Sequence, residues 1–180
     1  MKNLIFYDTE TTGLLKDFSQ ILQCGSVLTD AELNTLGEQN IGCAPLPWII
    51  PQPMAMITNK KIDLFNSNVS HYQMMKDLQM QWKQWSAQNP AIFITYNGHA
   101  FDEEMVRRQF FWNLLEPYTT NTNGNGRLDL MLMIHNIAAF FSDEISMPLF
   151  EGGPGISYKL EHLAIEHGID AGDAHDAIAD

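Results

Sequence analysis

Hydrophobic runs along the chain predict four β-strands. Apolar runs at residues 4–7, 21–29 and 36–44 are typical of strands. The turn-like stretch TDAELN between the last two runs favours an antiparallel meander. A β-branched and aromatic run at 91–96, directly after Pro90, predicts a fourth strand. The first three strands should therefore be antiparallel, and they precede the first long helix in the sequence.

Apolar residues with mostly helical spacing follow the meander. The spacing predicts helices at residues 72–85, 101–115 and 130–141. Ser157 is expected to cap a further helix that ends at Gly168, and a last helix should begin near Ala174. The stretch APLPWIIPQP carries four prolines and predicts an ordered loop or extended segment. Strands mixed with helices predict an α/β domain with a mixed sheet and no linker.

Composition and charge narrow the classes of protein. The 180 residues are 45% hydrophobic and 18% charged, which is typical of one folded domain. A net charge of −12 argues against wholesale wrapping around a polyanion. After Arg127 the only cation is Lys159. Nucleic acid could still bind locally where acidic side chains hold divalent cations, since these reverse the local field.

The sequence suggests a reduced, cytoplasmic protein. The N-terminus has no pattern of a secretory signal, and no apolar run approaches the roughly 18 residues that span a bilayer. Cys24 and Cys43 lack the spacing of a metal site, so we predict two buried free thiols.

Carboxylates recur where the predicted elements begin and end. Asp8 and Glu10 end the first strand, Asp102 opens the helix after the fourth strand, and Asp180 follows His175 by five residues. Residues two apart in a strand face the same side, so Asp8 and Glu10 should point together and Thr9 away. Converging carboxylates become favourable around two divalent cations about 4 Å apart. A histidine on the loop before the last helix would suit a general base.

Three stretches resemble the motifs of a known superfamily. DTETTG, YNGHAFDEEM and HDAIAD are similar to the three motifs of the DEDDh 3′–5′ exonucleases. IPQPMAMIT, RLDLM and KLEHLAIEHGIDAGDAHDAIAD are most similar to the nuclease domain of the exonuclease I family. The resemblance implies a ribonuclease H-like α/β fold with a mixed five-stranded sheet and flanking helices. It also implies removal of 5′-mononucleotides from the 3′ end of single-stranded DNA in DNA repair or recombination.

The same resemblance assigns roles to particular residues. The metal ligands would be Asp8, Glu10, Asp102 and Asp180. The catalytic residues would be His175, as the base, and Glu10, which would contact the terminal 3′-OH. Further contacts to the substrate would come from Thr9, Phe101 and Lys159. Glu103 and Asp176 are interpreted as solvated neighbours or helix N-terminal charges. The cofactors would be two Mg²⁺ ions, which Mn²⁺ could replace.

The resemblance also sets expectations for the domain and its partners. Residues 1–180 are expected to be a single exonuclease domain that is truncated at its C-terminal helix. The partners would be single-stranded DNA and, through missing C-terminal domains, a single-strand-binding protein, with no membrane.

Three alternatives remain open at this point. The chain could be a ribonuclease or a proofreading exonuclease of the same fold. It could be a non-catalytic module that grips single strands, or a metal-dependent hydrolase of a small phosphoester. The sequence leaves the oligomeric state open.

Overall fold

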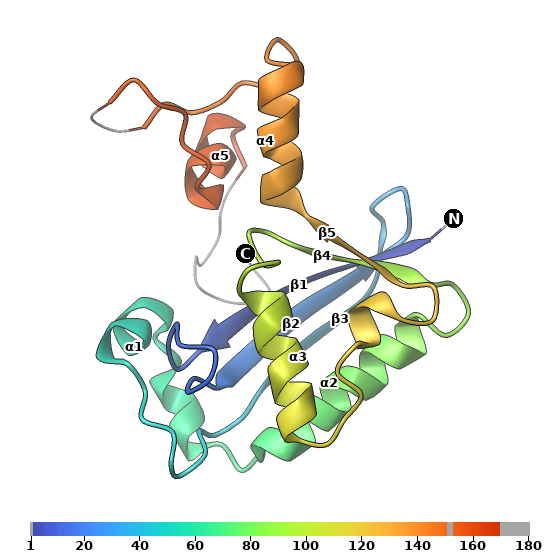
Figure 1. The fold of residues 1–180 in the computed structure, drawn as a ribbon, viewed down its shortest axis with the longest axis vertical. Coiled ribbons are helices and arrows are strands. Elements are labelled where there is room, and N and C mark those ends of the chain that lie inside the picture. The colour runs from blue at the N-terminus through green and yellow to red at the C-terminus, as the bar shows by residue number, and fades with distance from the viewer. Residues whose placement is uncertain (1, 151–152, 170–180) are drawn as a thin grey trace.

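A five-stranded mixed sheet forms the centre of the molecule (Figure 1). The computed structural model describes residues 2–150 and 153–169. The strand order is β3-β2-β1-β4-β5, with β1–β2 and β2–β3 antiparallel and β1–β4 and β4–β5 parallel. The strands are β1 (Asn3–Thr11), β2 (Ile21–Thr29), β3 (Thr35–Gly42), β4 (Ala91–Thr95) and β5 (Gly126–Asp129). The predicted meander and mixed sheet are confirmed.

Strand β5 could not be recognised from the hydrophobic pattern. It has four residues, GRLD, and directly follows the polar loop TTNTNGNG. A strand this short shows little alternation, and its identity depends on pairing with β4, from Ile92 opposite Gly126 to Thr95 opposite Asp129. The resemblance implies five strands, and the structure places the fifth here.

Four predicted helices are found with shifted ends: α2 (His71–Trp85), α3 (Asp102–Trp112), α4 (Leu130–Phe140) and α5 (Leu160–Glu166). Helix α1 (Pro53–Asn59) and the short 3₁₀ turns η1 (Lys61–Asn66) and η2 (Thr119–Asn121) were not predicted. The proline-rich stretch forms a turn at Pro47 and Trp48 and is otherwise without regular structure up to Pro53, which starts α1 as proline readily does. The predicted helix near Ala174 lies outside the described residues.

The prediction that Ser157 caps a helix was wrong. Helix α5 begins three residues later, and Lys159 is its N-cap residue. The Ser157 hydroxyl instead lies 2.8 Å from Nδ1 of His162, one turn into the helix. The same hydroxyl oxygen accepts the backbone N–H of Lys159 at 3.5 Å. Ser157 therefore contacts the first turn of α5 from a position before the helix, without being its N-cap residue.

The core lies between the sheet and helices α2 and α3. Trp82 of α2 packs against Tyr7, Phe93 and Phe110, with ring centroids 4.9, 5.1 and 6.1 Å away. Its indole N–H donates to the Ser26 hydroxyl at 3.0 Å, so the one polar atom of this buried ring is satisfied. The aromatic cluster fixes both helices on β1 and β4.

Both cysteines are buried free thiols, as predicted. Burial raises the pKa of the Cys43 thiol to about 12. The pKa of Cys24 is raised further by the same cause. A buried thiol with a raised pKa stays protonated and is a poor nucleophile, so both cysteines are interpreted as structural residues of the core.

A buried polar network joins α2, α3 and the start of β2. Oε1 of Gln109 accepts the backbone N–H of Ile21 at 2.9 Å and lies 2.7 Å from Nε2 of His71. Since this oxygen can only accept, Nε2 of His71 must carry the proton. The other ring nitrogen then accepts from the Asn113 amide at 3.3 Å. His71 is therefore held in its neutral form.

We expect His71 to make folding stability depend on pH. Burial lowers the pKa of His71 in the folded protein, although the Gln109 hydrogen bond opposes this. Its stabilising contribution is therefore complete above the unfolded pKa of about 6.5 and is lost as the pH falls towards the folded value. His71→Gln should reduce the loss of melting temperature below pH 6.5. The exposed His167→Gln should follow wild type, and a His71→Gln profile parallel to wild type would contradict the prediction.

Helices α4 and α5, drawn in orange and red in Figure 1, stand away from the sheet. Helix α4 reads LMLMIHNIAAF, yet none of its residues is buried. Only its first turn approaches the sheet, directly after β5 ends at Asp129. Within residues 2–150 and 153–169, no helix has the length and apolar character needed to cross a membrane.

Candidate active site

Strand β1 carries the first two carboxylates beyond the end of its partner β4. β4 pairs with Asn3–Phe6 only, whereas β2 pairs with β1 as far as Thr11. Alternation places Asp8 and Glu10 on one side of β1, with Asp8 half-buried and Glu10 buried. The unpaired edge of β1 after Phe6 leaves room for the loop that leads from β4 into α3.

The third carboxylate, Asp102, reaches β1 from this loop. The Thr9 hydroxyl donates to Asp102 Oδ1 at 2.5 Å, which ties Asp102 to the end of β1. Thr9 alternates with Asp8 and Glu10 along the strand, so this hydrogen bond is made on the other face of β1 from those two side chains. Asp102 is 6% exposed. Burial raises the pKa of its carboxyl from 3.8 to about 6, against the opposing effect of the Thr9 hydrogen bond. A buried carboxylate of this kind is expected where a cation is to be bound.

The thiol of Cys24 lies within electrostatic reach of both Asp8 and Asp102. Cys24 is the β2 partner of Thr9 in the sheet register. The pKa of Cys24 is raised first by burial and further by the negative charges of Asp8 and Asp102. Both carboxylates therefore lie in the same region of the sheet as this buried sulfur.

The loop before α3 is fixed by Asp129, the last residue of β5. Its carboxylate accepts backbone N–H groups of Asn97 at 2.9 Å, His99 at 3.1 Å and Met131 at 3.0 Å. Asn97 has φ of 58°, in the left-handed region that asparagine tolerates. At Gly98 an added Cβ would lie 2.5 Å from the Thr95 side chain, so only glycine fits. Asp129 lies in RLDLM and was not predicted as a functional residue; an acid directly before the predicted helix at 130–141 was the available signal.

Glu103 lies in the first turn of α3, as one of the two interpretations from the sequence had it, but it is buried rather than solvated. Its side chain is only 5% exposed and accepts hydrogen bonds from three elements. Tyr7 Oη donates to Oε2 at 2.8 Å, and Thr120 Oγ1 and Arg127 Nη1 donate to Oε1 at 2.6 and 2.9 Å. Because β1, η2 and β5 converge on this carboxylate, Glu103 fixes the first turn of α3 and the backbone of Asp102. Helical position alone could not reveal these distant partners.

Helix α1 supports the loop that follows β1. Gln52 donates its backbone N–H to the Thr12 carbonyl at 2.7 Å, and its Oε1 accepts the Leu14 N–H at 3.2 Å. The Asn59 amide donates to the Thr11 carbonyl at 2.9 Å. An added Cβ at Gly13 would lie 2.5 Å from the Gln52 side chain. The stretch IPQPMAMIT therefore packs directly on DTETTG.

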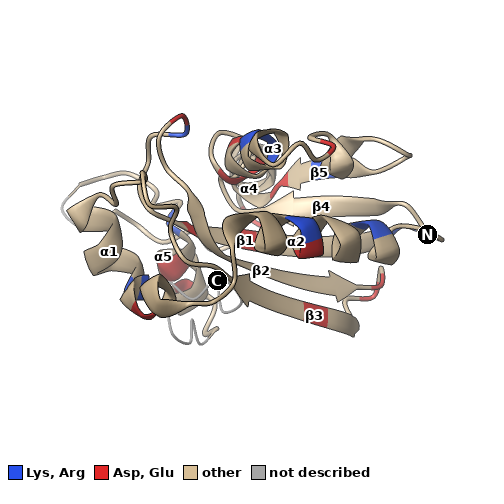
Figure 2. Ribbon diagram, turned by 90° about the horizontal axis from the view of Figure 1, so that it is seen from below, with Lys and Arg blue, Asp and Glu red and all other residues tan. Residues whose placement is uncertain are grey.

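The other predicted substrate residues have mixed environments. Phe101 is partly buried against the core, so only part of its ring is available for stacking. The Lys159 side chain is 61% exposed, and its Nζ lies 3.5 Å from Glu161 Oε1. Thr9 is occupied with Asp102. Lysine and arginine positions are otherwise spread over several elements, including α2, α3 and β5 (Figure 2).

The described part of the predicted metal site is incomplete by itself. Among residues 2–150 and 153–169, no group of three or more His, Cys, Asp and Glu side chains is arranged to hold a metal ion. His175 and Asp180 lie outside the described residues. The donors that are described, the carboxylates of Asp8, Glu10 and Asp102, are the hard oxygen ligands that suit Mg²⁺ and Mn²⁺.

Sequence comparison finds relatives over nearly the whole chain. No protein-family model matches it. Exodeoxyribonuclease I of Escherichia coli K12 is 29% identical over 190 residues, which cover 98% of this chain and 37% of the relative. The enzyme of the same name from Buchnera aphidicola subsp. Acyrthosiphon pisum is 29% identical over 99% of this chain and 43% of the relative. The chain thus spans about two fifths of the length of these relatives.

Solved structures agree with the sequence relatives. The E. coli exonuclease I complex with a dT13 oligonucleotide superposes with a TM-score of 0.90 and 26% identity over 100% of this chain and 39% of that one. A zinc-bound form of the ExoI–ssDNA complex gives a TM-score of 0.89 at 25% identity, covering 100% and 38%. An ExoI/SSB-Ct complex gives 0.87 at 25%, covering 99% and 39%.

The fold defines a ribonuclease H-like domain, with the mixed five-stranded sheet expected from the motifs. Within that class, the protein that this chain resembles over its whole described length is exodeoxyribonuclease I. The resemblance drawn from the three motifs is therefore confirmed.

Proposed function

We propose that this chain is the nuclease part of a metal-dependent 3′–5′ exonuclease that degrades single-stranded DNA and releases 5′-mononucleotides. One observation carries the proposal: in an exonuclease I-like fold, buried Asp102 is hydrogen-bonded to Thr9 at the end of β1, the strand that also carries Asp8 and Glu10. Burial of that carboxyl without a cation is unfavourable, which fits a site made to bind one.

Each predicted residue then has a defined task. Asp8, Glu10, Asp102 and Asp180 would hold two divalent ions, which supply charge neutralisation at the phosphate and a more acidic bound water. His175 would accept a proton from the attacking water. Glu10 would also position the terminal 3′-OH, and Lys159 would neutralise a substrate phosphate as a point charge.

Several finer points belong to the same proposal. We propose Mg²⁺ as the natural ion, two per site, with Mn²⁺ able to replace it; the zinc-bound exonuclease I complex supports a divalent ion in general. We further propose a cytoplasmic repair or recombination role, a single nuclease domain at residues 1–180, and a single-strand-binding protein as partner of the longer enzyme. The ExoI/SSB-Ct complex supports the last point.

A time course on end-labelled strands tests the proposal. With Mg²⁺ or Mn²⁺, 3′-labelled single-stranded DNA should lose its label as mononucleotide at once, while 5′-labelled strands shorten stepwise, and EDTA should stop both. Faster loss from RNA or from mispaired duplex ends would favour the other nucleases of this fold. Binding of DNA without turnover would indicate a binding module, and turnover of nucleoside monophosphate esters alone would indicate a small-phosphoester hydrolase.

His175→Ala should slow cleavage by a factor on the order of 10² to 10⁴, since general-base catalysis supplies about that much. The rise in melting temperature on adding Mn²⁺ should remain close to that of wild type, because the carboxylates stay in place. The exposed His167→Ala serves as the matched control and should cleave normally. Normal turnover by His175→Ala would remove this residue from the mechanism.

A further inference from the structure

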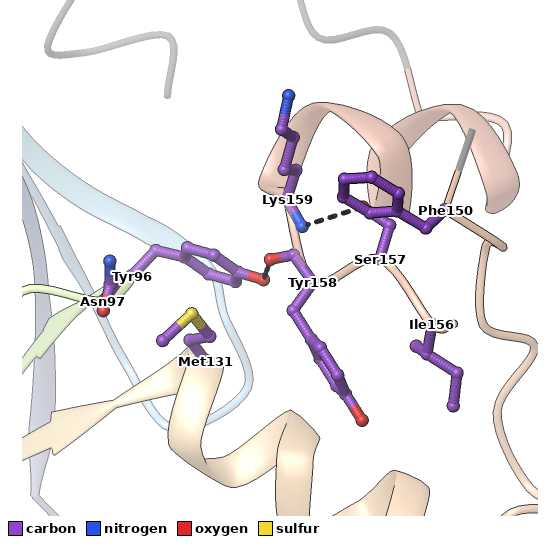
Figure 3. A pocket seen from close by; sticks show the side chains of 8 residues that line it. All are labelled: Tyr96, Asn97, Met131, Phe150, Ile156, Ser157, Tyr158 and Lys159. Atoms are coloured by element: carbon purple, nitrogen blue, oxygen red, sulfur yellow. Dashed lines mark hydrogen bonds between the residues drawn. The ribbon is translucent and has the colours of Figure 1, made fainter. Parts of the chain in front are cut away.

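The two neighbouring strands β4 and β1 are held at their ends by different parts of the chain. After β4, the Tyr96 hydroxyl donates to the Tyr158 carbonyl, which ties this end to the segment before α5 (Figure 3). β4 pairs with β1 only as far as Phe6, so this contact gives no direct support to Glu10, which lies further along β1. The end of β1 is therefore held by other residues.

The direction of the Glu10 side chain depends on the residues that follow it. The register of β1 against β2 shifts between Glu10 and Thr11. Such an irregularity bends a strand and changes where the neighbouring side chains point. Glu10 is only 9% exposed, so its packed side chain has little freedom to compensate for a displaced backbone. A contact that fixes Thr11 therefore also fixes Glu10.

The carbonyl of Thr11 points to the side of β1 that β4 leaves unpaired. The N–H of the same peptide group, that of Thr12, donates to the Gln20 carbonyl at 2.8 Å, directly before β2. The described residues contain no cis peptide bond, and the N–H and C=O of a trans peptide group point in opposite directions. The Thr11 carbonyl therefore faces away from β2 and needs a hydrogen-bond donor from another element.

Asn59, the last residue of α1, supplies this donor. Its side-chain amide donates to the Thr11 carbonyl at 2.9 Å, and its Oδ1 accepts the backbone N–H of Lys61 at 3.2 Å. All seven residues of α1 are described, and Asn59 is the only buried one. Met54 and Ile57 of the same helix are 70% and 69% exposed. The helix is thus oriented by a polar contact to β1 rather than by burial of its apolar side chains.

Helix α1 is anchored to this part of the chain at both ends. Before its first turn, the Gln52 N–H donates to the Thr12 carbonyl at 2.7 Å, and Gln52 Oε1 accepts the Leu14 N–H at 3.2 Å. At its last residue, Asn59 holds the Thr11 carbonyl. The helix therefore braces the chain directly after Glu10, and a rigid element places functional groups more precisely than a loop does.

We propose that Asn59 is a positioning residue for the reaction, which aims the Glu10 carboxylate by holding the Thr11 carbonyl. It acts through the backbone and not by touching substrate or metal. The inference rests on the proposed function, because the role of Glu10 at the cations and the terminal 3′-OH belongs to it. Displacement of such a group by about 1 Å can slow a reaction by a factor on the order of 10².

Two substitutions separate the donor from the rest of the Asn59 side chain. Asn59→Asp keeps an oxygen for the Lys61 N–H but presents an acceptor to the Thr11 carbonyl, whereas Asn59→Ala removes both contacts. Asn66→Asp, at an exposed position of η1, introduces the same charge and is the matched control. The two Asn59 variants should share one defect, and the control should behave as wild type.

Degradation of single-stranded DNA is measured over a range of Mn²⁺ concentrations. Both Asn59 variants should have a kcat lower by roughly tenfold or more, a KM for DNA close to wild type, and a higher half-saturating Mn²⁺ concentration. An added negative charge alone would attract the cations and lower that concentration, so a rise in Asn59→Asp reports lost positioning.

Two measurements do not depend on cleavage. The gain in melting temperature on adding Mn²⁺ should be smaller in both Asn59 variants than in wild type, because the site binds the ion less tightly. In EDTA, hydrogen exchange of the backbone at residues 8–14 should be faster in both variants than in Asn66→Asp, because the end of β1 has lost a hydrogen bond.

The outcomes separate positioning from a structural role. Wild-type kcat and Mn²⁺ dependence in Asn59→Asp would overturn the inference, even with a lower melting temperature. A defect confined to Asn59→Ala would assign it to the contact with Lys61, with the same consequence, and a raised KM with unchanged kcat would indicate contact with the strand instead.

Failure of the proposed function can be told apart from failure of this inference. If wild type gains melting temperature from Mn²⁺ but degrades no DNA, the proposed function is wrong, and the size of the Mn²⁺ gain in Asn59→Asp still decides the role of Asn59. A wild type that gains nothing from Mn²⁺ would overturn both. Degradation by wild type with equal Mn²⁺ gains in wild type and Asn59→Asp would overturn the inference alone.

Discussion

Asp102→Asn is expected to abolish cleavage and yet to raise the melting temperature of the metal-free protein. Asparagine keeps an oxygen that accepts from Thr9 but has no charge to bury. The rise in the pKa of Asp102 from 3.8 to about 6 corresponds to about 3 kcal/mol of lost stability in the ionised form. Cleavage should fall by roughly a thousandfold or more, because a ligand that anchors the cations is gone.

The pH dependence makes this prediction specific. A carboxyl whose pKa is raised on folding contributes fully to stability below its unfolded value and loses that contribution as the pH rises through the folded value. The variant should therefore be more stable than wild type above pH 6, and the difference should vanish below about pH 4. Thermal unfolding in EDTA across this range is the measurement. Asp63→Asn, at an exposed position, is the control for simple charge removal.

Addition of Mn²⁺ should reverse the difference, so that wild type has a higher melting temperature than Asp102→Asn. Binding to the folded state stabilises wild type in proportion to its affinity, whereas the variant lacks one anchoring charge. If Asp102→Asn has the same melting temperature as wild type in EDTA at pH 7, or still gains the full stabilisation from Mn²⁺, Asp102 is not a buried metal ligand.

Hydrophobic pattern was enough to find the elements that are long or strongly alternating. β2, α2 and α3 carry many apolar residues with clear spacing, so their packing agrees with their local sequence. β5 and α1 are short, and each depends on a neighbour: β5 on pairing with β4, and α1 on Gln52 at the loop after β1. The start of α5 was predicted wrongly because Ser157 has a good capping side chain but bonds His162 instead.

The site shows a similar division. Acids at strand ends and helix starts could be proposed from spacing, because Asp8, Glu10 and Asp102 occupy positions that any such fold brings to one edge. The residues that hold them there could not. Asp129 and Glu103 act partly through distant partners, His99 at 30 positions from Asp129 and Tyr7 at 96 from Glu103, and the sequence gives no register for such contacts. Adjacent acids also differ: Asp102 accepts from Thr9 at the end of β1, while Glu103 accepts from Tyr7, Thr120 and Arg127.

That difference leads to the second large effect, on folding. Glu103→Ala is expected to lower the free energy of unfolding by about 2–3 kcal/mol, the order of the cost of leaving a buried hydrogen-bonding group without its charged partner. The change leaves the buried Tyr7 hydroxyl without its acceptor and Arg127 without its carboxylate. Urea unfolding monitored by tryptophan fluorescence would report it, since Trp82 packs against Tyr7.

The next residue of α3 provides a matched control. Glu104 sits on the same turn but is 28% exposed and pairs with Arg107 and Arg108 on the surface. Exposed pairs contribute about 0–1 kcal/mol, so Glu104→Ala should unfold close to wild type. Glu103→Gln separates charge from geometry, because its amide oxygen can still accept from Tyr7 or Thr120 but cannot form the ion pair with Arg127. Equal unfolding energies for Glu103→Ala and Glu104→Ala would show that the network beneath Asp102 does not stabilise the fold.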